Sequence, residues 1–239
     1  MKRRVILIVL GVALIALAVA AFLVFQVFSG DVPEEAALSS PATSATSGDA
    51  GAPPGGFAGT WTLDTSSGSL DDGSSTFAGY RVDEELSTIG SHTAVGRTNQ
   101  VTGSMTLSEN QVTALDVTVD MTTLASDDDR RDNQLRERGI QTDAFPTAAF
   151  TLTQPIDIGQ VPAEGKAIDA TASGDLTLHG VTRHVDVPVH ARWTGSRIEI
   201  AGSVDITLAD YQIEKPVGFI VLSIGDTGTI EFHLLFEKS

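Results

Sequence analysis

The sequence predicts an all-β domain, either a closed antiparallel barrel or a sandwich, that follows one long apolar segment at the N-terminus. Three successive runs between residues 170 and 210 alternate apolar with polar side chains, which is typical of strands with one buried face. Between these runs stand His179-Gly180 and Gly195-Ser196, which suit two-residue hairpin loops. Further alternating runs recur at regular spacing on both sides of this meander, as in barrels and sandwiches.

The two loops fix one register for the three strands of the meander. Trp193 then faces Ile198 and Val187 faces Val204, so that the apolar side chains all fall on one face. Pro188 stands in the middle of a strand and has no N–H group to donate to a neighbouring strand. We therefore expect a bulge or an interrupted ladder beside Pro188.

The first 28 residues predict a membrane anchor. Residues 1–4 are a basic flank, and residues 5–28 carry no charge and are long enough to cross about 30 Å of hydrocarbon. The basic flank places the N-terminus in the cytoplasm and the rest of the chain outside it. A cleaved signal peptide is the alternative, with secretion as its result. We favour a single-pass anchor in the cell membrane because the apolar run exceeds the roughly 7–15 residues of a signal core.

Composition divides the remainder into a linker and one domain. Residues 29–56 are rich in Ala, Pro, Ser, Thr and Gly, which is typical of a flexible tether. Residues 57–239 have the size of a single domain. Three of the 15 basic residues precede the apolar segment, so 12 remain against 31 acidic ones, which argues against nucleic acid and anionic lipid surfaces as partners. The chain has no cysteine, which excludes disulfides.

The elements of the domain follow in order. One segment, Ser126–Gly139, predicts a helix that Ser126 caps, with acidic residues in its first turn and arginines in its last. Arg131 stands where a calcium loop would place an oxygen ligand, so no metal site is expected there. The expected strands outside the meander are Gly59–Asp64, Thr76–Val82, Thr98–Leu107, Gln111–Met121, Val217–Ile224 and Thr229–Phe236.

An ordered set of motifs carries a family resemblance. The set comprises Trp61–Asp64, Val101–Gly103, Arg131–Leu135, Phe145–Phe150 and Gly174–Thr182. It resembles the YceI-like family of polyisoprenoid-binding, lipocalin-like bacterial envelope proteins. The resemblance implies an eight-stranded antiparallel lipocalin-like barrel with one covering α-helix and a long isoprenoid chain in its lumen. One departure is Ser74–Thr76 ahead of Phe77, where the family often carries a His-Ser pair, so no role of that histidine is carried over.

The inner face of the predicted barrel gives the candidate ligand site. Small residues on that face would leave room for a ligand, whereas Phe219, Phe232 and Phe236 could fill the same space, as in ordinary core packing. Arg183 is the one charge on the apolar face and either snorkels outward at the rim or grips a ligand at the pocket mouth. The predicted lining residues are Phe77, Tyr80, Val101, Met105, Leu115, Val117, Val119, Ala172, Gly174, Leu176, Val185, Val187, Gly202, Val204, Phe232 and Leu234.

Motifs of catalysis are missing from the sequence. It contains no nucleophile elbow, P-loop or HExxH motif. His184 and His190 are six residues apart, about 20 Å along a strand, so they cannot share one metal ion. The histidines are interpreted as solvated strand-face and turn residues. We expect no catalytic residues, no metal and no cofactor.

Three functions are compatible with these observations. The first is a membrane-anchored, extracytoplasmic protein that carries or sequesters an apolar isoprenoid-type lipid in the barrel lumen. The second is an envelope protein-interaction module with a filled core and an acidic surface. A hydrolase is the third. The lumen-lining residues and the resemblance favour the first.

Overall fold

The computed structural model describes residues 32–39, 56–87, 90–160, 162–218 and 221–239. The predicted anchor, residues 5–28, lies outside these ranges, as do most of the predicted linker and Phe219. Among the described residues, none of the helices has the length and apolar character that a membrane crossing needs. Residues 34–239 form one compact unit.

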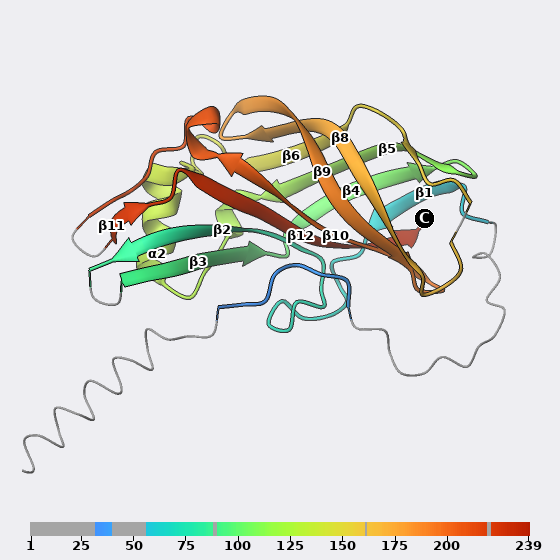
Figure 1. Ribbon diagram of the computed structural model, residues 1–239, viewed down its shortest axis with the longest axis horizontal. Helices are drawn as coiled ribbons and strands as arrows, with labels where there is room; N and C mark the ends of the chain where they lie inside the picture. Colours follow the sequence, from blue (N-terminus) through green and yellow to red (C-terminus); the bar gives the residue numbers. More distant parts are fainter. Residues whose placement is uncertain (1–31, 40–55, 88–89, 161, 219–220) are drawn as a thin grey trace, which may run out of the picture. The chain divides into compact units, whose positions relative to one another are not determined.

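An eight-stranded antiparallel barrel is the main feature of this unit (Figure 1). Its strands follow the order β1-β4-β5-β6-β8-β9-β10-β12, and β12 pairs with β1 to close the barrel. The hairpin β2–β3 and the short β11 extend from β12, and β7 pairs with β5. The strands are β1 Gly59–Leu63, β2 Phe77–Leu86, β3 Gly90–Thr98, β4 Val101–Leu107, β5 Gln111–Asp120, β6 Thr147–Leu152, β7 Ile156–Asp157, β8 Ala167–Leu178, β9 Val181–Trp193, β10 Arg197–Thr207, β11 Val221–Ile224 and β12 Thr227–Lys238.

The meander β8–β9–β10 has the predicted hairpin register. His179 (φ 52°) and Gly180 (φ 72°) form the first loop, and Trp193 lies opposite Ile198 beside the second. The ladder between β9 and β10 ends at Val189 and Gly202, directly beside Pro188, which confirms the expected interruption. The predicted pairing of Val187 with Val204 is wrong, because the two strands separate at that point.

A second break in the wall lies between β7 and β8. Strand β6 pairs with β8 only from Gly174 to Thr177, and the chain then crosses to β5, where Ile156 lies opposite Val112. Among the described residues, no strand pairs with residues 167–172 on this edge of β8. The hydrogen-bonded ladder of the barrel wall is therefore interrupted at two places, one beside Pro188 and one beside β7.

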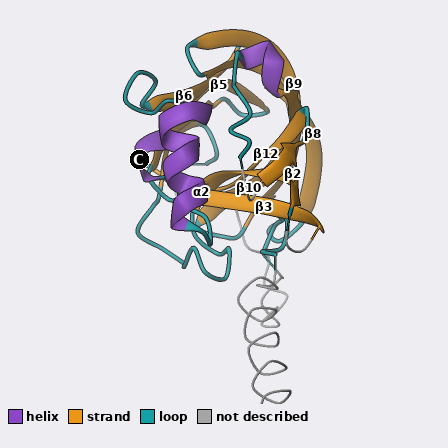
Figure 2. Ribbon diagram, turned by 90° about the vertical axis from the view of Figure 1, so that its left-hand side faces the viewer, coloured by secondary structure: helices purple, strands orange, loops and turns teal. Residues whose placement is uncertain are grey.

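The predicted helix is present but begins later than expected. It consists of α2 (Asp129–Gln134) followed by the π-helical turn η2 (Leu135–Gly139). The side chain of Asp128 caps it by accepting hydrogen bonds from Arg130 N and Arg131 N, so the predicted cap, Ser126, was wrong. Ser126 instead donates to the buried carboxylate of Asp132. Figure 2 looks onto this end of the barrel and shows α2 at its rim.

Two hydrophobic clusters fill the barrel interior. The first surrounds Trp61, Trp193 and Phe236, and the second lies near the helix around Ile206 and Tyr211. The central side chains of each cluster are almost completely buried. Half-buried residues that pack against both clusters mark the level at which the two meet.

Candidate functional site in the barrel interior

Half-buried apolar side chains line the inner wall where the two clusters meet. Val119, Phe150 and Val185 pack against both clusters, and Val204 and Phe232 pack against the first. All five retain accessible surface although they belong to the interior. Covering such surface with an apolar ligand is favourable by about 25 cal/mol for each Å² removed from water. We define these five residues as the inner wall.

The break beside Pro188 explains why part of the inner wall stays accessible. Val185 lies on β9 and Val204 on β10, both beyond the last pair of that ladder, Val189 and Gly202. A proline cannot donate a backbone hydrogen bond, so the ladder cannot continue through Pro188 toward β10. On its other side Pro188 stays in the sheet, opposite Thr171 of β8. The backbone chemistry of one residue thus separates two strands over the inner wall.

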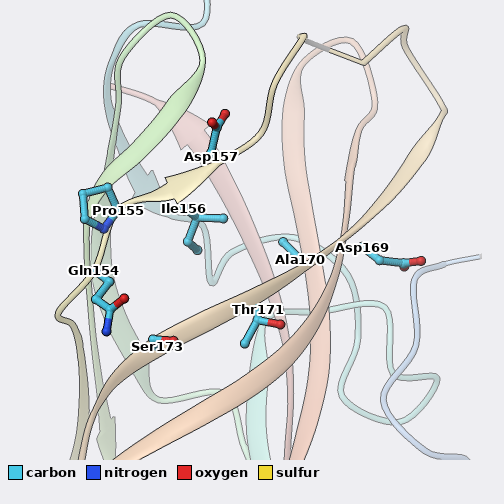
Figure 3. A pocket seen from close by; sticks show the side chains of 8 residues that line it. All are labelled: Gln154, Pro155, Ile156, Asp157, Asp169, Ala170, Thr171 and Ser173. Carbon is cyan, nitrogen blue, oxygen red and sulfur yellow. The ribbon is translucent and has the colours of Figure 1, made fainter.

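The second break contains a small pocket (Figure 3). Its volume is about 270 Å³, slightly below the roughly 300–1,000 Å³ of sites for drug-sized ligands. Most of its lining is polar, but Ile156 and Ala170 also pack against the first cluster. The pocket is therefore too small for a long apolar chain, although its floor reaches the interior. Its lining residues are Gln154, Pro155, Ile156, Asp157, Asp169, Ala170, Thr171 and Ser173.

The inward glycines are covered by aromatic rings of neighbouring strands. A Cβ atom at Gly174 would lie 2.4 Å from Cζ of Phe150, and one at Gly202 would lie 2.8 Å from Cζ of Phe232. The expectation that these small residues leave empty space is therefore wrong. They admit two phenylalanine rings, and those rings belong to the inner wall.

The structure places the predicted lining residues on the inner face with one exception. Phe77 lies on the outer face, opposite His233 of β12, where its ring stacks on the histidine at 5.9 Å. Phe77 and Tyr80 are three positions apart, and alternation puts such residues on opposite faces. The inner position of this strand belongs to Ala78 and Tyr80. Buried in the clusters are Val101, Met105, Leu115, Val117, Ala172, Leu176, Val187 and Leu234.

Arg183 lies exposed at the rim beside the 3-10 turn η3 (Leu208–Tyr211). Its Nε donates a hydrogen bond of 2.8 Å to the carbonyl oxygen of Asp210, and its guanidinium lies 3.4 Å from the carboxylate of the same residue. The guanidinium therefore points out of the interior, as expected for a side chain that snorkels at the rim.

The sequence interpretation missed a buried charged cluster on the outer face of β10 and β12. Glu199, Glu231 and His233 are each 1% exposed, although alternation had assigned them to solvent. Glu231 accepts a hydrogen bond of 2.8 Å from Arg81 Nε and lies 2.7 Å from Arg97 Nη2. A signal was present in the sequence, because apolar Ala201 and Leu235 share this outer face and are also buried.

His233 connects the cluster to the loop before β2. Its Nδ1 lies 2.8 Å from the carbonyl oxygen of Ser75, and its Nε2 lies 2.8 Å from Oε1 of Glu199. The other oxygen of Glu199 accepts from Arg192, whose Nη2 is 2.5 Å away. Of the remaining histidines, His179 is also buried, so the solvent assignment was wrong for both His179 and His233. His184 and His190 are exposed beside aspartates, as predicted.

We expect the outer cluster to make the protein less stable in acid. Burial alone would raise the pKa of Glu199, but hydrogen bonds from His233, Ser39 N–H and Arg192 outweigh burial and hold the pKa at about 2, below the ordinary 4.5. The stabilisation is complete above pH 4.5 and is lost as the pH falls toward 2. One proton contributes a slope of about 1.4 kcal/mol per pH unit. Urea unfolding at several pH values should show that Glu199→Gln flattens the slope; an unchanged slope would contradict the assignment.

The comparison with known proteins agrees with this architecture. A family model described as the YceI-like domain matches residues 61–236. The chain belongs to the YceI-like family. A UPF0312 protein of Vibrio vulnificus (strain YJ016) is 30% identical over 159 residues, which cover 57% of this chain and 80% of the relative.

Solved structures show that other proteins have the same fold. A polyisoprenoid binding domain from Saccharophagus degradans aligns with a TM-score of 0.56 at 18% identity, over 75% of this YceI-like chain and 98% of that domain. BcnA of Burkholderia cenocepacia aligns with a TM-score of 0.50 at 19% identity, over 66% of this chain and 95% of BcnA. At these identities the likeness concerns the fold alone.

Proposed function

We propose that this YceI-like protein binds an apolar, isoprenoid-type lipid along the inner wall and carries or sequesters it outside the cytoplasm. The observation that carries the proposal is the accessible apolar surface of the inner wall where the two clusters meet, at Val119, Phe150, Val185, Val204 and Phe232. The name of the Saccharophagus degradans domain, which shares the fold, supports the same ligand class. Residues 5–28 would anchor the protein in the cell membrane, with the barrel on the outer side.

Burial of the lipid chain would supply most of the binding free energy. The inner wall offers only hydrocarbon and aromatic surface, which suits a branched apolar chain and gives few directional contacts. The one polar group we assign to the ligand's polar end is the phenol of Tyr211, which is 2% exposed and whose oxygen has no hydrogen-bond partner among the described residues. Burial raises the pKa of Tyr211, so the phenol stays protonated and can donate a hydrogen bond.

In this proposal, Arg183 lies at the mouth of the site. It lies next to Tyr211 across η3, where it is bound to Asp210. An anionic or carbonyl-bearing end of a lipid could replace Asp210 as the partner of the Arg183 guanidinium. The free-energy cost of this replacement would be small, because Arg183 and Asp210 are both about half exposed. We propose binding of the lipid alone, without a chemical reaction on it.

A tryptophan in the inner wall should block the site. We expect Val204→Trp to cover the inner wall and to reduce bound lipid at least tenfold, since the larger side chain would take the place of the ligand on this surface. Ser203→Trp is the matched control, because Ser203 is the adjacent residue of β10 and is exposed on the outer face. Native mass spectrometry of the full-length protein, before and after lipid extraction, measures the bound lipid.

Several outcomes of this experiment would contradict the proposal. An equal loss in both tryptophan variants would mean that the inner wall is not the site. No co-purifying apolar mass, together with no rise in melting temperature when an isoprenoid lipid is added, would favour the alternative of an interaction module with a filled core. The experiment also needs a folding control: an unchanged melting temperature of the unliganded Val204→Trp protein would show that the substitution leaves the barrel folded.

A further inference from the structure

Residues 34–39 lie against the outer face of β10 and β12, and we call this segment the strap. It belongs to the stretch that composition had assigned to a flexible linker. Figure 1 shows it in blue beneath these strands, and hydrogen bonds connect it to the buried charged cluster. The barrel wall on this face therefore has a peptide bound to it that comes from its own chain.

The cluster recognises the main chain of the strap at both ends. At one end, Ala36 N donates a hydrogen bond of 3.1 Å to Glu231 Oε2, while Arg97 donates to the carbonyl oxygen of Glu34. At the other end, Ser39 N donates a hydrogen bond of 2.5 Å to Glu199 Oε1. Each glutamate thus binds one N–H group of the strap, and a guanidinium beside it binds a carbonyl oxygen.

The side chains of the strap contribute less to recognition than its backbone. Among the hydrogen bonds between strap and cluster, only Ser39 uses a side chain: Arg192 Nη2 lies 2.9 Å from its Oγ and 2.6 Å from its carbonyl oxygen. Ala36 and Leu38 are half-buried, whereas Ala37 and Ser39 are exposed. The two half-buried positions thus hold a small residue and, two positions later, a larger apolar one.

The receptor side of this contact is preorganised. Glu199 is held by Arg192, and Glu231 is held by Arg81 and Arg97, so contacts within the barrel wall fix the orientation of each carboxylate. Charge-assisted hydrogen bonds to fixed groups are about twice as strong as neutral ones.

We propose that the outer face of β10 and β12 is a peptide-binding site that recognises main-chain N–H and carbonyl groups, and that residues 34–39 occupy it in cis. The site is separate from the inner wall and does not depend on a lipid. It holds the N-terminal part of the chain to the barrel wall at Glu34, well before the first strand begins at Gly59.

Amide hydrogen exchange in the full-length protein, followed by NMR, tests the docking. We expect the Ala36 amide to exchange at least about tenfold more slowly than the Ala37 amide, because only Ala36 donates to a buried carboxylate. Ser39→Pro removes the N–H group bound to Glu199 and should accelerate exchange at Ala36 about tenfold. Ala37→Pro, the matched control, removes an N–H group without a partner among the described residues and should change exchange at Ala36 less than twofold.

A second measurement tests whether the site is a receptor for peptides. A synthetic peptide of residues 33–40, added to the Ser39→Pro protein, should shift the amide resonances of β10 and β12 and fill the vacated site. The same peptide with proline at the position of Ser39 should shift them at least tenfold more weakly. Equal exchange at Ala36 and Ala37 in the unchanged protein, or equal effects of both proline variants, would overturn the proposal.

Discussion

Replacing Glu231 by alanine should lower the free energy of unfolding by about 3–5 kcal/mol. The side chain is 1% exposed and stands between Arg81 and Arg97, at 2.8 and 2.7 Å. Its removal takes away the carboxylate that both guanidiniums bind in this buried environment, and it also removes the acceptor of Ala36 N. The cost arises from burying guanidiniums that have lost this carboxylate, because a buried ion pair by itself contributes little net stability.

Glu237→Ala is the control for this prediction. Glu237 lies on the same strand and bonds Arg197 at 2.7 Å, but its side chain is 48% exposed. Exposed ion pairs contribute about 0–1 kcal/mol, so this variant should unfold almost like the unchanged protein. Chemical denaturation followed by circular dichroism compares the two. A loss below about 1 kcal/mol in both variants would show that solvent reaches Glu231 and that the outer cluster is not a buried network.

The second large effect is expected at Gly202, where replacement by alanine should lower the free energy of unfolding by about 2–3 kcal/mol. A Cβ atom there would lie 2.5 Å from the carbonyl oxygen of Pro188 and 2.8 Å from Cζ of Phe232. The ring can turn, but the oxygen belongs to the backbone of β9 and can move only with its strand. The substitution therefore pushes β9 away from β10 at the last pair of their ladder.

Gly228→Ala on β12 is the matched substitution. A Cβ atom at Gly228 would meet its nearest neighbours at 3.5 and 3.6 Å, which is ordinary contact. We expect a change within about 0.5 kcal/mol in either direction, since alanine loses less conformational freedom than glycine on folding. Thermal and urea unfolding measure both variants. Similar stability of Gly202→Ala and Gly228→Ala would contradict this prediction, because it would mean that β9 and β10 can move apart at Pro188 without a free-energy cost.

The sequence predicted the meander well because two kinds of information coincide there. The loops at His179 and Gly195 set the register, and alternation set the faces, so an error of one residue would have broken both. The position of Pro188 predicted where the ladder stops. The number of barrel strands came from the family resemblance, because local patterns alone do not distinguish a barrel from a sandwich.

The candidate site was less predictable, for physical reasons. Alternation assigned the inner face correctly, but whether glycine leaves a void depends on which ring reaches it, as Phe150 does at Gly174. Glu231 and His233 have the pattern of solvent-facing residues, and their partners, such as Ala36 for Glu231 and Ser75 for His233, lie far away in the sequence. The strap could not be found from a side-chain pattern, because its backbone atoms make most of the hydrogen bonds to the cluster.

The two breaks in the barrel wall have a consequence for the size of a guest molecule. A continuous wall limits how long an enclosed molecule can be, whereas a wall that parts at a break limits only its thickness. One break lies beside Pro188 and the other beside Ile156, where the pocket is too small for a long apolar chain unless its lining residues move. Under the proposed function, a chain that passes the wall at such a break would be selected by its cross-section and not by its length.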